Sequence, residues 1–276
     1  MSATVLLVGG FGNLGGRIAA HLSQFQDHQI VLASRKKQAA PLWAKDAQTI
    51  QLDVTDPTTF TNIPKSVNCI VQLAATNDVD SAQNPELART VTTEGTASLL
   101  NAAIHNGIER FVYFSTAHVY GAPLQGTFIE SSPTHAVHPY ATTHLEAESA
   151  VAAAHENRDI QGIRVRLSNG FGRPMAYEAA DWRTLTSDLC RQAVVEKRME
   201  MRTDGLQERN FITKTDIARA VQHLIALPTS LISDGLFNLG GSQSQSLLAM
   251  ATTIQERAQK KYSAEIPLHR PDSTSA

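Results

Sequence analysis

The chain has 276 residues, 42% of them hydrophobic, and a formal net charge of −2. This is enough apolar material for one large domain, or a domain with a small appendage, around a buried core. The near-neutral charge and the lack of a long basic run argue against nucleic acid as a main partner, because phosphate backbones are bound by clustered Lys and Arg. A small charged ligand fits this composition better.

Cysteines and apolar runs also limit the class of protein. The two cysteines, Cys69 and Cys190, are too few for a disulfide framework and have no metal-type partners at metal-ligand spacing, so we expect no metal site. No apolar run approaches the ~20 residues needed to cross a bilayer. The apolar N-terminal stretch lacks the basic leader and cleavage site of a signal peptide. We therefore expect a cytoplasmic protein with no membrane partner.

The first predicted elements are a strand, a glycine-rich turn and a helix in VLLVGGFGNLGGRIAAHL, residues 5–22. The glycines fit both G-x-x-G-x-x-G and G-x-G-x-x-G. Such a turn lets the backbone approach a pyrophosphate while the helix N-terminus supplies free N–H groups, so it indicates dinucleotide binding more than an ordinary tight turn. The residues that we expect to contact the cofactor here are Gly9, Gly12, Asn13, Leu14 and Gly15.

The second predicted strand, residues 29–33, is followed by Ser34, Arg35 and Lys36. In NAD-binding units an acidic residue at this place accepts the ribose hydroxyls, whereas arginine accommodates the 2′-phosphate of NADP. This stretch has no carboxylate and has cations instead. We therefore expect NADP rather than NAD as the cofactor, although a solvated basic turn has the same composition.

Up to Leu167, short runs rich in β-branched and apolar residues alternate with helical patterns. Near-continuous hydrophobicity indicates strands that are covered on both faces. We predict strands at residues 4–8, 29–33, 49–52, 69–73, 110–115 and 162–167, and helices at 14–22, 87–106 and 140–156. The alternation predicts an α/β fold, a doubly wound parallel sheet of the Rossmann type that binds ligands at the carboxyl ends of its strands.

After Leu167 the regular alternation fades. The remaining segments are predicted as a helix at 182–197, an Asp-Gly turn between polar strands within 202–212, a helix at 215–227, a strand at 235–240 and a last helix at 246–261. We therefore predict a dinucleotide-binding domain at 1–168. Residues 169–276 are predicted to form mostly a small C-terminal substrate-binding lobe, with segments that return to the main domain.

Six further segments follow the glycine turn in a fixed order. They are LDVTD (52–56), QLAA (72–75), FSTAHVYG (114–121), YATTH (140–144), RLSNGFGRP (166–174) and RNFITKTDIARA (209–220). Together they resemble, over nearly the whole chain, the extended short-chain dehydrogenase/reductase family of sugar-nucleotide epimerases, dehydratases and ketoreductases. The resemblance implies that Asp53 and Val54 contact adenine and that Ala74 and Ala75 lie beside the cofactor. Thr92 stands where the family usually has Asn.

The same resemblance assigns the catalytic residues. Thr116 is the counterpart of the catalytic Ser/Thr, and YATTH occupies the place of Y-x-x-x-K, so Tyr140 resembles the general acid/base. His144 stands where the family has lysine, which holds the nicotinamide ribose and lowers the pKa of the tyrosine. Histidine is shorter and mostly neutral at neutral pH.

Three interpretations of His144 remain open. It could bond a ribose hydroxyl and be protonated often enough to assist Tyr140, or another cation could replace the lysine. In the third interpretation the site is degenerate, and the protein binds dinucleotide without turnover, as a redox sensor or partner-binding module. We favour a working enzyme, because Thr116 and Tyr140 are both retained and a general acid first needs a positioned proton.

Three residues are candidates for substrate binding. The resemblance implies that Arg209 binds a substrate diphosphate, which suits its fork of donors, although it could instead pair with Asp216 or Glu208. Asn169, at a strand end, could bond a sugar or diphosphate oxygen. His118 lies where some dehydratases of the family carry an acidic residue, and the lack of carboxylates there argues against a 4,6-dehydratase.

These residues predict an epimerase or oxidoreductase that acts on a nucleotide-sugar or a related carbonyl or hydroxyl substrate. Family members commonly continue beyond the equivalent of IPLHRPD, so a smaller carbonyl compound remains an alternative substrate. The helices predicted at 87–106 and 140–156 carry alanine-rich faces. As in many relatives, we expect them to form the interface of a homodimer.

Overall fold

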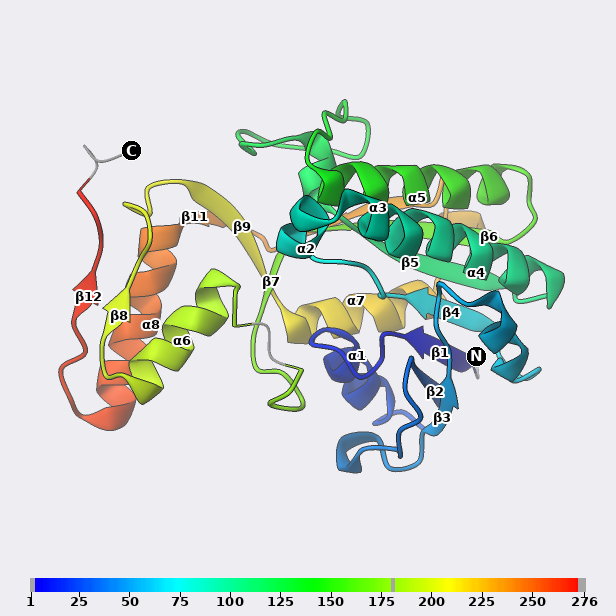
Figure 1. Ribbon diagram of the computed structural model, residues 1–276, viewed down its shortest axis with the longest axis horizontal. Helices are drawn as coiled ribbons and strands as arrows, with labels where there is room; N and C mark the ends of the chain where they lie inside the picture. The colour runs from blue at the N-terminus through cyan, green and yellow to red at the C-terminus, as the bar shows by residue number, and fades with distance from the viewer. Residues whose placement is uncertain (1–2, 180–181, 273–276) are drawn as a thin grey trace.

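The computed structural model describes residues 3–179 and 182–272 and shows a seven-stranded sheet beside a smaller lobe (Figure 1). The sheet has the order β10-β6-β5-β4-β1-β2-β3, and all neighbouring strands are parallel. Its strands are β1 (Ala3–Val8), β2 (His28–Ser34), β3 (Gln48–Gln51), β4 (Cys69–Gln72), β5 (Arg110–Thr116), β6 (Gln161–Leu167) and β10 (Leu236–Leu239). The predicted α/β fold class is confirmed.

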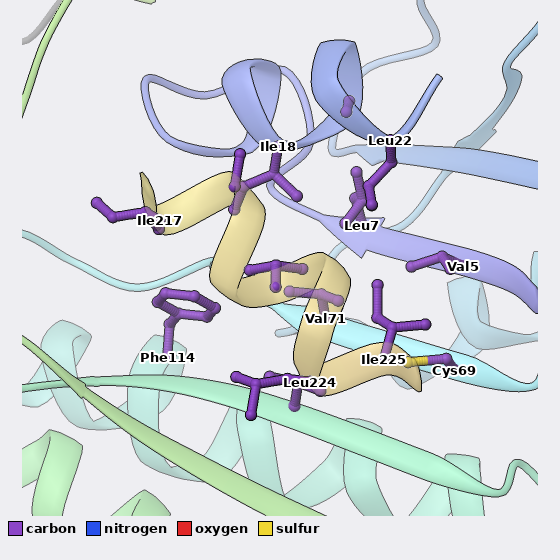
Figure 2. Close-up of a cluster of buried hydrophobic side chains, with 14 of the residues drawn as sticks. Val5, Leu7, Ile18, Leu22, Cys69, Val71, Phe114, Ile217, Leu224 and Ile225 are labelled. Atoms are coloured by element: carbon purple, nitrogen blue, oxygen red, sulfur yellow. The ribbon is translucent and has the colours of Figure 1, made fainter. Parts of the chain in front are cut away.

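Helices cover both faces of this sheet. Along β1, Val5 and Leu7 face one side and Leu6 and Val8 the other, because successive side chains of a strand alternate. Helices α1 (Gly15–Leu22) and α7 (Lys214–Ala226) pack on the first side. Figure 2 shows α7 running across this cluster of apolar side chains. Helices α4 (Gly95–His105) and α5 (Pro139–Glu156) cover the second side.

The helix predicted at 87–106 is interrupted in the structure. The segments are α2 (Asp78–Gln83), α3 (Pro85–Ala88), a π-helical turn η3 (Arg89–Glu94) and then α4. A Cβ atom at Gly95 would lie 2.9 Å from Val54 Cγ2, so only glycine allows the start of α4 to approach Val54 this closely. Thr92, within the turn, is fully buried, and its hydroxyl contacts that of Thr76. The period-3.6 pattern gave no sign of this turn.

The smaller lobe contains a three-stranded sheet with the order β11-β9-β7, which lies between the large sheet and the helices of the lobe (Figure 1). Its strands are β7 (Asn169–Phe171), β9 (Glu208–Thr213) and β11 (Ser244–Ser246). Farther out, α6 (Leu185–Val195) and α8 (Leu247–Tyr262) pack together with β8 (Met199–Glu200) and β12 (Leu268–His269). The chain returns from this lobe to the large sheet through α7 and β10.

The predicted Asp-Gly turn is present, and Gly205 adopts a φ of +74°. Its flanking strands do not pair with each other, because β8 pairs with β12 while β9 lies between β7 and β11. The remaining short elements are η1 (Leu42–Ala44), η2 (Pro57–Asn62), η4 (Ala117–Tyr120) and η5 (Thr229–Leu231). Among the described residues, no helix combines the length and apolar character that a membrane crossing requires.

Candidate active site

The glycine turn between β1 and α1 is shaped by close backbone contacts. Gly9 has a φ of +87°, a conformation that side-chain-bearing residues rarely adopt. A Cβ atom at Gly15 would lie 2.2 Å from the carbonyl oxygen of Gly9. No side chain caps the N-terminus of α1, and its first turn has no acidic residue. These features leave free N–H groups and positive dipole at the turn, which suit an anion such as a pyrophosphate.

Asn13, in the glycine turn, is held by a residue far along the chain. Lys214, at the start of α7, is 4% exposed, and its Nζ donates to Asn13 Oδ1 at 2.6 Å and to the Gly172 carbonyl oxygen at 2.7 Å. Lys214 thus connects the turn to the segment after β7. The sequence gave no reason to place Lys214 at Asn13, because 201 positions separate the two residues.

The residues predicted to hold the adenosine half lie at the ends of β2 and β3. Ser34 Oγ accepts hydrogen bonds from the backbone N–H of Lys36 and from Gln38, which fixes the turn after β2. Arg35 and Lys36 are exposed, and neither has an ion-pair partner in the part of the chain that the structure describes. Asp53, just after β3, accepts from the Thr55 N–H and hydroxyl.

The loop after β4 meets the glycine turn. A Cβ atom at Gly9 would lie 3.3 Å from the backbone nitrogen of Ala74, so the two segments are in contact. Ala75 follows and is exposed, while Val54 is buried against Gly95. The predicted cofactor residues of β1, β2, β3 and β4 therefore gather at one edge of the sheet, the edge of the carboxyl ends.

Thr116 and Tyr140 meet at the same edge. Thr116 is the last residue of β5, and Tyr140 lies in the first turn of α5. Burial raises the pKa of Tyr140, a hydrogen bond with Thr116 lowers it, and the negative charge of Asp78 raises it further. Because none of these neighbours is a cation, the Tyr140 hydroxyl holds its proton at neutral pH.

His144 lies one helical turn after Tyr140, and its ring centroid is 4.6 Å from that of Tyr140. It is 3% exposed, and its Nδ1 is 2.7 Å from the hydroxyl of Tyr113 on β5. Burial, followed by the charge of His118, lowers the pKa of His144 to about 3. A buried imidazole with a lowered pKa disfavours the interpretation in which a protonated His144 assists Tyr140.

A buried ion pair lies one turn farther along α5. Arg166 of β6 donates to Glu148, with Nη2 2.7 Å from Oε2, and both side chains are almost fully buried. The Ser115 hydroxyl also bonds Glu148, and the Arg166 guanidinium lies 4.8 Å above the ring of Tyr120. We did not anticipate this network, since its members lie on four elements, β5, η4, α5 and β6, and follow no local pattern.

A cavity of about 630 Å³ opens between the end of β6, the loop 123–128 and the small lobe. Asn169 and Arg209 both line it, as do Tyr120 and Arg166. The Asn169 amide donates to the Asn210 carbonyl at 3.0 Å, so one of its two hydrogens is used within the protein.

Among the residues that the structure describes, the alternative pairing of Arg209 with Asp216 or Glu208 is not found. Arg209 Nη1 donates to the backbone carbonyl of Glu208 at 2.8 Å, while Asp216 pairs with Arg219. His118 lies beside Tyr140, with 6.3 Å between their ring centroids. Burial lowers the pKa of His118, and the charge of Arg209 lowers it further. The structure thus brings Thr116, Tyr140 and His144 together, with His118 beside Tyr140.

Comparison with known proteins shows where this arrangement recurs. The model of the NAD dependent epimerase/dehydratase family matches residues 5–240. The dTDP-D-glucose 4,6-dehydratase of Mus musculus is 27% identical over 262 residues, which are 91% of this chain and 71% of the mouse protein. The UDP-glucose 4-epimerase of Streptomyces lividans is 24% identical over 275 residues, 92% of this chain and 81% of that protein.

Solved structures share the fold. An epimerase from Methanothermobacter thermautotrophicus superposes with a TM-score of 0.83 at 22% identity, covering 100% of this chain and 82% of that one. The UDP-glucuronic acid 4-epimerase of Bacillus cereus, in complex with UDP-glucuronic acid and NAD, gives a TM-score of 0.80 at 21% identity, covering 98% and 86%.

Proposed function

This chain belongs to the NAD dependent epimerase/dehydratase family, and on that premise we propose that it is a dinucleotide-dependent enzyme acting on a nucleotide-sugar or a related carbonyl or hydroxyl compound. The observation that carries the proposal is the hydrogen-bonded pair Thr116 and Tyr140 at the edge of the sheet that also carries the glycine turn. The residue after Thr116, Ala117, lines the cleft that Asn169 and Arg209 also line. A proton donor, a cofactor cradle and a substrate space thus occur at one edge of the sheet.

The residues present fit a dinucleotide. The N–H groups of Gly10 and Gly12 donate to the carbonyl oxygens of Leu7 and Gly9 and so fix the turn, while α1 presents its uncapped N-terminus to a pyrophosphate. A dinucleotide bound in this turn supplies or accepts a hydride at the reacting carbon. Relatives support the choice, since the Bacillus cereus epimerase was solved with NAD.

The chain's own residues supply proton transfer and positioning. Tyr140 Oη gives its proton to a substrate oxygen, or takes one from it, while the Thr116 hydroxyl shares a hydrogen bond with that oxygen. Arg209 presents a fork of donors to a diphosphate, and the second hydrogen of the Asn169 amide is available to a sugar oxygen. His118 borders the space between them.

For the cofactor we propose NADP over NAD. Arg35 and Lys36 are exposed cations after β2, and the Ser34 hydroxyl holds the turn that carries them. A charge-assisted hydrogen bond contributes ~1.5–3 kcal/mol, which corresponds to about tenfold or more in affinity.

Titration of the protein with NADP and NAD tests this choice. NADP should bind at least about tenfold more tightly, and Arg35→Ala should weaken NADP binding without weakening NAD binding. The control is Lys65→Ala, which removes an exposed cation before the start of β4, at the opposite edge of the sheet. Equal or tighter binding of NAD to the unmodified protein would end the proposal for NADP.

The proposed activity is tested with reduced dinucleotide and a panel of nucleoside diphosphate keto sugars and simple ketones. Consumption of the reduced dinucleotide with one of them, dependent on Tyr140, is the expected result. The neutral state of His144 favours a second candidate, a degenerate protein that binds dinucleotide without turnover. Tight binding with no consumption across the panel would be the result expected of that second candidate.

We also propose a homodimer built on α4 and α5. These helices cover one face of the large sheet (Figure 1), and α5 carries the small side chains Ala150 and Ala153 on its partly exposed side. Small residues allow helices of two subunits to approach closely. Light scattering should give twice the chain mass of 29.9 kDa; a mass of one chain would remove this part of the proposal.

A further inference from the structure

Lys214 connects two parts of the candidate site that are far apart in the sequence. It is the first residue of α7 and directly follows β9, while Gly172 directly follows β7. Its ammonium group donates to Asn13 Oδ1 at 2.6 Å and to the Gly172 carbonyl oxygen at 2.7 Å. A lysine that is only 4% exposed has lost hydration and side-chain freedom. Its hydrogen bonds must therefore compensate for both losses.

The Asn13 end of this connection lies in the glycine turn. Asn13 and Leu14 directly precede the first residue of α1. Within residues 3–179 and 182–272, the backbone N–H groups of these two residues donate to no other residue, so they are available to an anion. Lys214 holds the side chain of Asn13 instead. It thus fixes the turn without occupying the N–H groups that a pyrophosphate would bind.

The other end of the connection lies in the three-stranded sheet. The strands β7 and β9 are parallel, and their last residues are register partners. Gly172 and Lys214 follow these residues, so both lie at the same end of the strand pair. Asn169 on β7 and Arg209 on β9 line the cleft. The glycine turn is therefore connected to the wall of the cleft through Lys214 and one short stretch of paired strand.

Arg17, in the first turn of α1, makes a second contact with the same two segments. Its Nη2 donates to Thr215 Oγ1 at 3.1 Å, and its Nη1 lies 3.4 Å from Met175 Sδ. Thr215 follows Lys214, and Met175 lies shortly after Gly172. A thioether is a weak acceptor and the contact with Thr215 is exposed, so these interactions are weaker than the buried ones of Lys214. We therefore assign the main connection to Lys214.

We propose that Lys214 is a positioning residue that couples the glycine turn to the wall of the cleft, so that a dinucleotide bound in the turn raises the affinity of the cleft for a nucleoside diphosphate. The inference rests on the proposed function and deepens it. A pyrophosphate on the turn restricts the position of Asn13, and Lys214 passes this restriction to β7 and β9. By linkage, a nucleoside diphosphate in the cleft raises the affinity for the dinucleotide by the same factor.

The first test is hydrogen–deuterium exchange of the full chain, alone and saturated with whichever of NADP and NAD binds more tightly. The dinucleotide should slow exchange in the glycine turn and also in β7 and β9. In Lys214→Met it should slow exchange in the turn only. The control Lys197→Met removes an exposed ammonium that lies over the Tyr262 ring in the outer lobe, and it should behave as the parent.

Two results of this test would overturn the inference. One is slower exchange confined to the turn in the unmodified protein, and the other is unchanged protection of β7 and β9 in Lys214→Met. Saturating ADP-ribose, which has the pyrophosphate but no nicotinamide, should protect β7 and β9 as well. Protection by the dinucleotide but not by ADP-ribose would assign the effect to the nicotinamide and would also overturn the inference.

Further variants separate coupling from a structural role of Lys214. Asn13→Ala removes the acceptor in the turn and keeps the contact with Gly172, so it should also confine the protection to the turn. Lys214→Arg keeps a cationic donor and should restore part of the protection of β7 and β9. A merely structural role would speed exchange in β7 and β9 before any dinucleotide is added. Full protection of both strands in Asn13→Ala would contradict the coupling.

The second test measures the coupling factor by calorimetric titration with UDP, dTDP and GDP, with and without saturating dinucleotide. At least one of these should bind about fivefold more tightly when the dinucleotide is present. In Lys214→Met the ratio should fall to about one, and in Lys197→Met it should stay at the parent value. A ratio of one in the unmodified protein, or no binding of any of the three, would overturn the inference and leave dinucleotide binding intact. Absence of dinucleotide binding in the unmodified protein would instead overturn the proposed function.

Discussion

At the scale of single residues, the buried His144 makes the stability of the fold sensitive to acid. Burial lowers its pKa to about 3 in the folded protein, against 6.5 in the unfolded chain. Between these values the unfolded chain binds a proton that the folded protein does not. The contribution of His144 is thus fully present above about pH 6.5 and is lost as the pH falls toward about 3, at up to about 1.4 kcal/mol per pH unit.

The measurement is denaturant unfolding of the unmodified protein and of His144→Gln at about pH 7, 5 and 4. Contributions of other groups cancel in the comparison of the two proteins. The free energy of unfolding of the unmodified protein should fall toward that of the variant as the pH is lowered. Parallel pH dependences would show that His144 accepts a proton within the folded state.

Tyr140 offers the most direct residue-scale test of the chemistry. Tyr140→Phe removes the hydroxyl and keeps the ring, so turnover should fall by at least about a hundredfold, the lower range for a lost general acid. Dinucleotide affinity, measured by titration, should be nearly unchanged. Tyr262→Phe, in the distant helix α8, should keep full turnover. Substantial turnover in Tyr140→Phe would mean that another group supplies the proton.

Glu148 and Glu146 lie on the same helix and allow the stability of a buried ion pair to be compared with that of a surface ion pair. Glu148→Gln leaves the Arg166 guanidinium without its counter-ion in the interior, and we expect it to lower the free energy of unfolding by about 3–5 kcal/mol. Glu146→Gln breaks a pair with Arg89 that is half exposed, and it should cost less than about 1 kcal/mol. Similar costs for the two variants would show that the buried pair stabilises no more than the surface pair.

At the scale of elements, the glycine turn depends on Gly15 more than on its neighbour. Gly15→Ala would bring a Cβ atom to 2.2 Å from the Gly9 carbonyl oxygen, a backbone atom that cannot move without opening the turn. We expect a loss of about 3 kcal/mol in the free energy of unfolding. A Cβ atom at Gly16 would meet side-chain atoms of Met175 at 3.3 Å and of Trp43 at 3.5 Å, so Gly16→Ala should stay within about 1 kcal/mol of the parent. Thermal or denaturant unfolding distinguishes them.

The elements show which parts of the fold a sequence pattern can reveal. The central strands of the large sheet were predictable because both their faces are buried, so that runs such as those of β1 and β5 are mostly apolar. The π-helical turn η3 was not, because it depends on the contact of Gly95 with Val54, 41 positions away. The hydrophobic periodicity of residues 87–106 carries no information about a contact with Val54.

The candidate active site also contains residues that the sequence predicts and residues that it does not. Gly9, Gly15, Thr116 and Tyr140 were predictable because motifs fix their places relative to strand ends. The partners Tyr113 and Arg166 were not, since each meets α5 across the sheet–helix interface and either could have been an ordinary core or surface residue. The environment that lowers the pKa of His144 could not be predicted from the sequence for the same reason, because it depends on burial, and burial is decided by packing.

At the scale of the whole molecule, Arg110 joins two distant parts of the chain. It lies on β5, is 8% exposed, and donates to the carbonyl oxygens of Leu224, Ile225 and Leu227 at the end of α7. Arg110→Met would leave these buried acceptors without partners and should cost about 3 kcal/mol or more. Arg219→Met, which breaks an exposed pair with Asp216, should cost less than about 1 kcal/mol.

Denaturant unfolding of the two variants measures both costs. If Arg110→Met were as stable as Arg219→Met, the end of α7 would be held by apolar packing alone, through the cluster shown in Figure 2.

The three-stranded sheet that joins the lobe to the rest of the molecule has a mechanical consequence. Its strands come from three separate stretches of chain and are hydrogen-bonded to one another. A single connecting segment would leave the lobe free to rotate, whereas three hydrogen-bonded strands restrict its rotation relative to the large sheet. Because β7 and β9 are paired strands of this sheet, Asn169 on β7 and Arg209 on β9 are held at a fixed spacing on one wall of the cleft.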